Sequence, residues 1–214
     1  IDISVLIQED ADNYVKETPL IPIGSDTFIG FRADMNVHYG THLDGPLHFN
    51  GNGIPLDQIP FDRYFFEKPL VVDIPKGPGE KILPEDLLPH KENLEAADLL
   101  LIRTGFWKYR IEQPQVYENN GPGVSSQLAR YFQEEMSQLK AVALDFVSLA
   151  SYSDRTDGDL AHQTMLGMFH SRYICIIEDV NMRGLPEGFL KRAAAVPLIM
   201  EGIDSSPVTM WAEY

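Results

Sequence analysis

Cysteine is nearly absent from this 214-residue chain, in which Cys175 is the single thiol. One thiol has no partner for an internal disulfide, which mildly favours a reducing compartment, and we expect a cytoplasmic location. Cys175 lies within an apolar run, so we interpret it as a small buried hydrophobic side chain. Because the chain begins with Ile1 rather than Met, we expect its N-terminus to have been trimmed, and a removed signal peptide is compatible with this.

Basic residues and long hydrophobic runs are also scarce. Asp and Glu number 32 against 17 Lys and Arg, which gives a formal net charge of −15. Such a surface repels phosphate backbones and anionic lipids, so we expect neither a nucleic acid nor a membrane as partner. No apolar run approaches the roughly 20 residues that span a bilayer. Divalent cations would offset part of the charge, although an acidic surface that aids solubility is the simpler interpretation.

Apolar runs and helical spacing predict a single α/β domain over residues 1–214. Hydrophobic residues make up 44% of the chain and charged residues 23%, which is typical of a soluble globular protein. Helical and strand patterns alternate in the second half of the chain, as in layered α/β folds. The predicted strands are 1–7, 20–23, 27–31, 69–74, 97–103, 141–145, 173–177, 194–200 and 208–212. The predicted helices are 83–88, 125–138, 159–169 and 186–192.

Residues 38–48 concentrate four side chains suited to metal binding, namely His38, His42, Asp44 and His48. Imidazole and carboxylate are the nitrogen and oxygen ligands that a divalent ion such as zinc takes in proteins. In a straight strand His38 and His42 would lie roughly 13 Å apart, which is awkward for two ligands of one ion. Glycines and Pro46 make a stable helix unfavourable, so we expect an extended segment that bends at Gly40.

Glu178 and His162 are the strongest candidates for further ligands. Glu178 directly follows the apolar run 173–177, where a carboxylate is costly to bury unless it is paired, protonated or bound to a cation. His162 by itself is a weak signal. If both reach segment 38–48, the site has enough ligands for two ions bridged by Asp44, an arrangement that can generate a hydroxide and polarise a carbonyl.

Other polar and aromatic candidates have simpler structural interpretations. We expect Asp145, at the end of a buried strand, to cap the next turn rather than to line a pocket. Trp107 and Tyr109 would either stack on an aromatic substrate or pack in the core. Phe28 and Phe31 would belong to the core or, as the weaker alternative, to the wall of a pocket.

Residues 38–48 resemble the signature of the cyclase family, His-x-Gly-Thr-His-x-Asp-x-Pro-x-His, and keep every fixed position of it. That family includes bacterial kynurenine formamidases and isatin hydrolase. Supporting stretches follow in the family's order: Leu-Ile-Arg-Thr-Gly at 101–105, Ala-Leu-Asp-Phe-Val-Ser at 143–148, Ala161-His162, and Ile-Ile-Glu-Asp at 176–179. The resemblance implies a swivelling β/β/α domain with a central barrel-like mixed sheet and peripheral helices, assembled as a homodimer or homotetramer.

The resemblance also implies a role for each candidate residue. A first metal ion would be held by His38, His42 and Asp44. A second, where present, would be held by Asp44, His162 and Glu178, and the catalytic acid/base would be His48. The metal would be divalent, with Zn²⁺ favoured and Mn²⁺ possible, because His, Asp and Glu serve both. The spacing from His162 to Glu178 is longer than in the formamidases, so we expect an extra turn or loop near the site at 168–171.

The activity implied by the resemblance is hydrolysis of a small amide by a metal-activated water, with His48 moving the proton. An arylformamidase reaction on a substrate of the N-formylkynurenine type is the first expectation. A cyclic amide of the isatin type, a lactone or a true cyclase reaction is the alternative. A protein that binds a metal or small molecule without catalysis is the remaining alternative, and the retained His48 argues against it.

Overall fold

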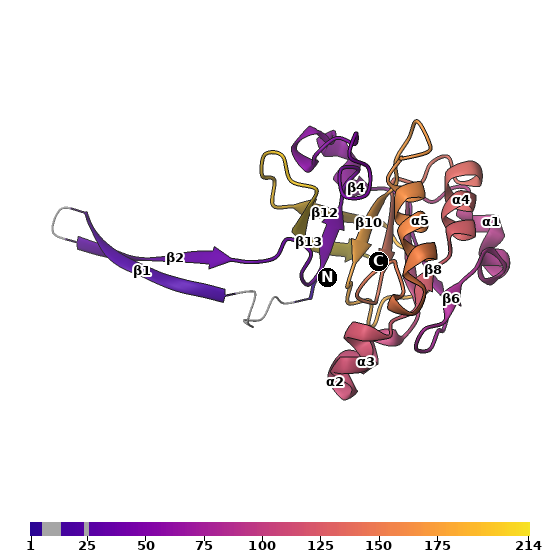
Figure 1. Cartoon of the computed structure of the whole chain (residues 1–214), viewed down its shortest axis with the longest axis horizontal. Coiled ribbons are helices and arrows are strands. Elements are labelled where there is room, and N and C mark those ends of the chain that lie inside the picture. The colour runs from indigo at the N-terminus through magenta and orange to yellow at the C-terminus, as the bar shows by residue number, and fades with distance from the viewer. Residues whose placement is uncertain (6–13, 24–25) are drawn as a thin grey trace.

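The computed structural model describes residues 1–5, 14–23 and 26–214, and its centre is a mixed sheet of nine strands (Figure 1). In spatial order the strands are β11 (Gly188–Phe189), β5 (Pro69–Asp73), β7 (Leu99–Arg103), β9 (Ala141–Leu144), β10 (Cys175–Glu178), β3 (His42–Asp44), β13 (Ser205–Glu213), β12 (Arg192–Pro197) and β4 (Phe65–Phe66). Strands β5, β7, β9 and β10 run parallel, and the other pairs are antiparallel. The curled sheet with helices around it confirms the predicted mixed α/β architecture.

The four parallel strands are central because they are apolar on both faces. Every residue of β9 and β10 is buried. Side chains alternate along each strand, so Leu100 and Val142 face one core, while Leu101 and Ala143 face the other. The first core is covered by the helices, and the second is closed by β12 and β13. Each buried Leu or Ile contributes about 1.5–3 kcal/mol, so the ends of these strands form a rigid support.

Two longer helices cover one face of the sheet. Helix α4 (Ser126–Glu135) confirms the predicted helix, and the Ser125 hydroxyl caps it by accepting a hydrogen bond from the backbone nitrogen of Leu128 at 3.1 Å. Helix α5 (Arg155–Met165) begins earlier than predicted because Asp154 caps it, so His162 lies in its last turn rather than near its start. The remaining helical segments are α1 (Lys91–Leu94), α2 (Tyr109–Glu112), α3 (Pro114–Asn119), and the 3-10 helices Leu56–Gln58, Phe61–Tyr64, Pro84–His90, Phe106–Lys108 and Tyr152–Asp154.

Two secondary-structure predictions are wrong. The predicted helix 186–192 is replaced by β11 and the start of β12, and Gly188 has a φ of 100°, which a right-handed helix does not allow. Of the predicted strand 1–7, the described residues 1–5 form an isolated bridge between Asp2 and Trp211, and residues 6–7 lie outside the described residues. A further small sheet pairs β6 (Lys81–Ile82) with β8 (Gly123–Val124).

Strands β1 (Tyr14–Ile23) and β2 (Asp26–Asp34) form an antiparallel hairpin that projects from the body (Figure 1). Both are longer than the predicted strands 20–23 and 27–31. Phe31 is 67% exposed, so the prediction that it belongs to the core or to a pocket wall is wrong. The side chain of Phe28 lies outside the described residues. Within the described part of the chain, no helix combines the length and the apolar character needed to cross a membrane.

Candidate active site

Strand β3 and its neighbours assemble the predicted ligands. Gly40 has a φ of 66°, which glycine adopts without strain, and the chain bends there as predicted. Strand β3 then lies between β10 and β13, antiparallel to both, and His42 is the register partner of Glu178. His42 and Asp44 face the same side of the sheet because they are two residues apart. The pairing therefore brings the carboxylate at the end of β10 onto segment 38–48.

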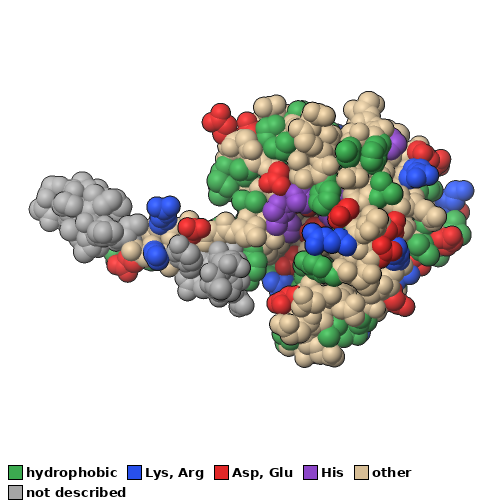
Figure 2. Space-filling view, viewed as in Figure 1, with side chains coloured by type: hydrophobic (Ala, Val, Ile, Leu, Met, Phe, Trp, Pro, Cys, Tyr) green, Lys and Arg blue, Asp and Glu red, His purple; other side chains and the backbone are tan. Residues whose placement is uncertain are grey.

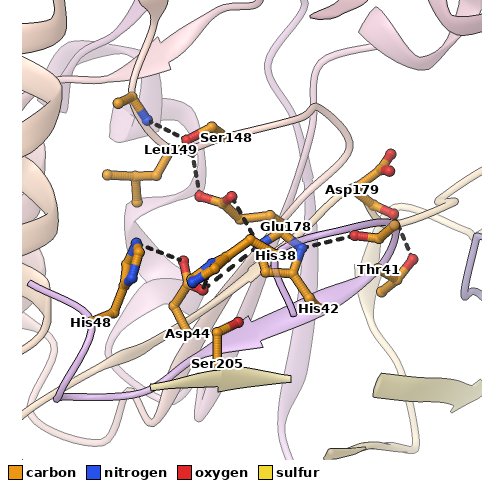
Figure 3. A network of polar contacts seen from close by, with 12 residues as sticks. His38, Thr41, His42, Asp44, His48, Ser148, Leu149, Glu178, Asp179 and Ser205 are labelled. Atoms are coloured by element: carbon orange, nitrogen blue, oxygen red, sulfur yellow. Dashed lines mark hydrogen bonds and ion pairs between the residues drawn. The ribbon is translucent and has the colours of Figure 1, made fainter. Parts of the chain in front are cut away.

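The predicted ligand atoms lie at distances that suit a shared ion. Two ligands about 2.0–2.2 Å from one tetrahedral ion are roughly 3.4 Å apart. Nδ1 of His38 lies 3.0 Å from Oδ1 of Asp44, and Nε2 of His42 lies 3.6 Å from that oxygen. Nε2 of His42 is also 3.3 Å from Oε2 of Glu178, whose other oxygen lies 3.5 Å from Nε2 of His162. Figure 3 shows the side chains of these residues pointing toward one another, namely His38, His42, Asp44 and Glu178.

Backbone carbonyls determine which ring nitrogen faces this centre. Nδ1 of His42 donates to the carbonyl of Gly40 at 2.8 Å, and Nδ1 of His162 donates to the carbonyl of Gly158 at 3.0 Å. Because a carbonyl only accepts, each Nδ1 carries a hydrogen and each Nε2 is directed at a carboxylate. Outer hydrogen bonds of this kind are typical of histidines that ligate metals.

Asp44 provides the clearest sign that the site is built for a cation. Its side chain is 1% exposed, and neither of its carboxylate oxygens has a hydrogen-bond partner. Nε2 of His42 is buried without a hydrogen bond as well. Burying a carboxylate in this way costs several kcal/mol unless a positive charge compensates it. A divalent ion coordinated by these atoms would supply that charge, so the donor set fits a metal.

Two overlapping groups have ligand atoms within 4.8 Å of one another: His38, Asp44 and His48, and His42, Asp44 and Glu178. Asp44 belongs to both groups, which is the position that a bridging carboxylate would take. The structure thus brings the predicted ligands together, whereas their division between two ions stays a prediction.

The charges of the site are strongly coupled. Burial lowers the pKa of His42, but the Asp44 and Glu178 carboxylates outweigh this and raise it to about 9. Burial raises the pKa of Glu178, but its contacts with the imidazoles of His162 and His42 hold it well below its usual range. Protons on the histidines and a metal ion therefore compete for the same carboxylates.

His48 differs from the other histidines of segment 38–48. Its side chain is 21% exposed, and its Nε2 lies 3.9 Å from Oδ2 of Asp44. Its Nδ1 donates to Oδ2 of Asp204 at 2.8 Å, and Nε2 of His38 lies 3.2 Å from the same oxygen. Sequence reasoning missed Asp204. One signal for it exists, since Asp204 directly precedes strand β13, whose residues alternate between buried and exposed positions.

A cavity of about 320 Å³ lies over the histidines and Glu178, with an apolar wall that includes Phe49, Val147 and Tyr152. A second cavity of about 490 Å³ shares part of this lining, including Val147 and Tyr152. Figure 2 shows the histidines gathered in a hollow on one face, with charged side chains of both signs beside them. Phe49 was not predicted, and its ring stacks on His162 with 4.5 Å between the ring centroids.

The other sequence candidates lie outside the two cavities at the histidines. Asp145 is buried and accepts hydrogen bonds from the loop after β7, including one from the backbone nitrogen of Gly105 at 2.8 Å. Tyr109 lines neither of the two cavities, and its ring packs on Phe106 with 4.7 Å between centroids. Trp107 also lies outside both, but it borders a separate cavity of about 450 Å³, where the guanidinium of Arg183 lies 4.9 Å from the centroid of its ring. Residues 168–171 form a loop of bends after α5, where an extra turn or loop was expected, and they line neither cavity.

The sequence matches one protein family and resembles several known proteins. Residues 1–151 match the family described as "Putative cyclase". The chain is 32% identical over 119 residues to an uncharacterized protein of Haemophilus influenzae, covering 56% of this chain and 84% of that protein. It is 28% identical over 180 residues to a kynurenine formamidase of Bacillus thuringiensis subsp. konkukian, covering 83% of this chain and 76% of that protein.

Solved structures share the fold over nearly the whole chain. Isatin hydrolase A from Labrenzia aggregata superposes with a TM-score of 0.77 at 19% identity, covering 99% of this chain and 92% of that one. A predicted metal-dependent hydrolase from Bacillus stearothermophilus gives a TM-score of 0.74 at 24% identity, covering 99% and 96%. Because the family match spans well over half of its residues, the chain belongs to the cyclase family.

Proposed function

We propose that this chain is a metal-dependent amidohydrolase that acts on an N-formyl aromatic amine, an arylformamidase reaction. The observation that carries the proposal is the buried Asp44 carboxylate, which lacks hydrogen bonds and is surrounded by imidazoles, with the partly exposed His48 beside it. Relatives named kynurenine formamidase support this substrate class. A hydrolase of this kind needs a cation and a proton carrier within reach of one cavity, and the site offers ligands for the first and His48 for the second.

The donor atoms suit one or two divalent ions. A first ion would be held by Nδ1 of His38, Nε2 of His42 and the carboxylate of Asp44. A second would be held by the carboxylates of Asp44 and Glu178 and by Nε2 of His162. Zn²⁺ is favoured, with Mn²⁺ as the alternative, because both accept imidazole and carboxylate ligands. When bound, such an ion lowers the pKa of a water molecule and polarises a carbonyl oxygen.

His48 is positioned to move a proton at Nε2. Its Nδ1–H is held by Asp204, so Nε2 is the ring atom left free to exchange a proton. In the proposed reaction Nε2 takes the proton of the attacking water and the hydroxyl joins the formyl carbon. The carbon–nitrogen bond then breaks, and Nε2 returns the proton to the departing nitrogen, which gives formate and an aromatic amine. The charge of Asp204 stabilises the imidazolium between these transfers.

The cavity suits a small aromatic substrate. Its volume of about 320 Å³ is in the range of small-molecule sites, and Phe49, Val147 and Tyr152 provide apolar surface for a ring. A cyclic aromatic amide or a lactone is the alternative substrate class, since the same wall and the same proton carrier would serve ring opening.

Activity after metal removal and return tests the proposal. The protein is stripped with EDTA, reloaded with Zn²⁺ or Mn²⁺, and assayed for release of kynurenine from N-formylkynurenine, with isatin and a lactone in parallel. We expect metal-dependent formamide hydrolysis that falls about 10²- to 10⁴-fold in His48→Ala while bound metal is retained. His170→Ala, at a histidine outside both cavities, is the matched control.

Three outcomes contradict the proposal. Full activity of His48→Ala would remove its assigned role. Turnover of isatin or the lactone without turnover of the formamide would favour the alternative class. Full metal loading with no turnover of any amide, ester or lactone would favour a binding protein.

A further inference from the structure

Helix α5 presents a line of three polar side chains to the 320 Å³ cavity: Arg155, Asp159 and His162. Their spacing of four and three residues places them on one face of the helix. At 1.5 Å rise per residue, Asp159 stands about 4.5 Å and Arg155 about 10.5 Å along the helix axis from His162. The line therefore begins at the candidate metal ligands and ends at the outer rim of the cavity.

Arg155 is available to bind an anion. Among the described residues that line this cavity, it is the only lysine or arginine. Its side chain is 73% exposed, and its nearest acidic partner is Asp159, with 4.0 Å between Nε and Oδ1. Exposed pairs of this kind contribute little, so a ligand can displace the contact at small cost. By contrast, Arg110 beside the second cavity is already paired with the nearly buried carboxylate of Asp179.

Asp159 is suited to the opposite charge. Its side chain is 41% exposed, and along α5 it lies between Arg155 and the candidate ligand His162. An ammonium group is favoured beside this carboxylate, because opposite charges attract and the exposed contact with Arg155 is weak. A carboxylate is favoured only at the guanidinium of Arg155, whose forked donors match its two oxygens.

We infer that Arg155 and Asp159 bind the α-amino-acid head group of the substrate, with the carboxylate on Arg155 and the ammonium on Asp159. This inference rests on the proposed formamide hydrolysis and specifies which formamide is preferred. In N-formylkynurenine about seven bonds separate the formyl carbon from the carboxylate carbon, a span of roughly 6–8 Å. With the formyl group near His162, that span reaches the zone between Asp159 and the flexible Arg155 side chain. Isatin has no such head group and would leave this pair unused.

The test compares two formamides that differ only in the head group. N-formylkynurenine carries it, and 2-formamidoacetophenone has the same ring, formamide and ketone without it. For the metal-loaded wild type we expect a higher kcat/KM on N-formylkynurenine. In Arg155→Gln the ratio of the two kcat/KM values should fall about tenfold, because a charge-assisted bidentate contact is lost. In Asp159→Asn it should fall about threefold, and Arg155→Lys should restore part of the preference.

Controls and a binding measurement keep the outcome decisive. Arg130→Gln, which removes an exposed charge from α4, should leave the ratio as in the wild type. Calorimetry with the metal-loaded protein should show kynurenine binding about tenfold more tightly than 2-aminoacetophenone, a difference that Arg155→Gln should remove. Equal losses on both formamides in Arg155→Gln, or equal binding of both amines by the wild type, would overturn the head-group site. Absence of turnover of either formamide would instead overturn the proposed function.

Discussion

Replacing Asp204 by Asn removes a charge from the site while preserving the shape of the side chain. Oδ2 of Asp204 lies 2.8 Å from Nδ1 of His48 and 3.2 Å from Nε2 of His38. Burial raises the pKa of Asp204, but its contacts with His48 and His38 hold it below its usual value, so the group is charged at neutral pH. An amide oxygen still accepts the Nδ1–H of His48, so Asp204→Asn keeps the ring orientation and removes the charge that stabilises the imidazolium.

The expected loss follows from the difference between two kinds of hydrogen bond. A bond to a charged group contributes about 1.5–3 kcal/mol, and a neutral one about 0.5–1.5 kcal/mol. The two ranges differ by about 1–1.5 kcal/mol, and no larger value is taken because Asp204 is 32% exposed. At 1.36 kcal/mol for each factor of ten, kcat on N-formylkynurenine should fall about 5- to 15-fold.

The assay is a double-mutant cycle on metal-loaded protein, with metal content measured in each variant. If Asp204 acts through His48, then Asp204→Asn should cost little further activity in the His48→Ala background. Asp62→Asn, at an exposed carboxylate outside both cavities, is the matched control and should keep wild-type kcat. The same fold-loss in both backgrounds would refute the argument, and so would a loss of activity that merely follows loss of metal.

Other consequences of the site and the fold can be measured directly. Zn²⁺ at about 100 times its dissociation constant should stabilise the wild type by about 2.7 kcal/mol and raise Tm by roughly 5–10 °C, and Asp44→Asn should lose this rise; an equal rise in both proteins would place the zinc elsewhere. Because the pKa of His42 is about 9, its imidazole must lose a proton before a metal ion binds. Calorimetry should therefore show that the apparent affinity for Zn²⁺ weakens about tenfold per pH unit as the pH falls from 8 to 6, and an affinity independent of pH would contradict this. Burial raises the pKa of Asp157, but hydrogen bonds from Lys81 and Ser126 lower it below its ordinary value. The ionised Asp157 therefore stabilises the folded protein fully at pH values above the ordinary pKa of an aspartate, and this stabilisation is lost as the pH falls through the lower pKa that Asp157 has in the folded state. Urea unfolding of Asp157→Asn should therefore show a cost of about 1 kcal/mol at pH 7, discounted for solvent screening, that shrinks below pH 4; a cost independent of pH would rule out the charge as its source.

The sheet and the ligand segment were predictable because their signals are local. Short runs of apolar residues such as 97–103 and 141–145 favour strands that are buried on both faces of a sheet. In the structure they form β7 and β9. The bend at Gly40 followed from the conformational freedom of glycine. Glu178 was predictable because a carboxylate at the end of a buried strand requires a compensating charge.

What the sequence did not reveal depends on contacts between distant segments. Asp204 meets His38 across 166 positions of the chain, through a pairing of β13 with β3 that no periodicity encodes. The start of α5 was misplaced because the cap at Asp154 follows a polar segment without an apolar pattern. The helix predicted at 186–192 is wrong because Gly188 has a left-handed φ and pairs with Val71 of β5, a contact between distant segments. The sequence does not indicate a binding role for Arg155, because an exposed arginine differs from other surface arginines only through the cavity beside it.

Strand β3 is three residues long, yet it joins the early and late parts of the chain through β10 and β13. During synthesis the histidines of segment 38–48 leave the ribosome long before Glu178 and Asp204. The nascent chain thus carries the full signature motif but has none of the distant side chains that complete the centre. Enclosure of the proposed metal centre is consequently a late step of folding, and a chain that ends early would expose these histidines without forming the enclosed site.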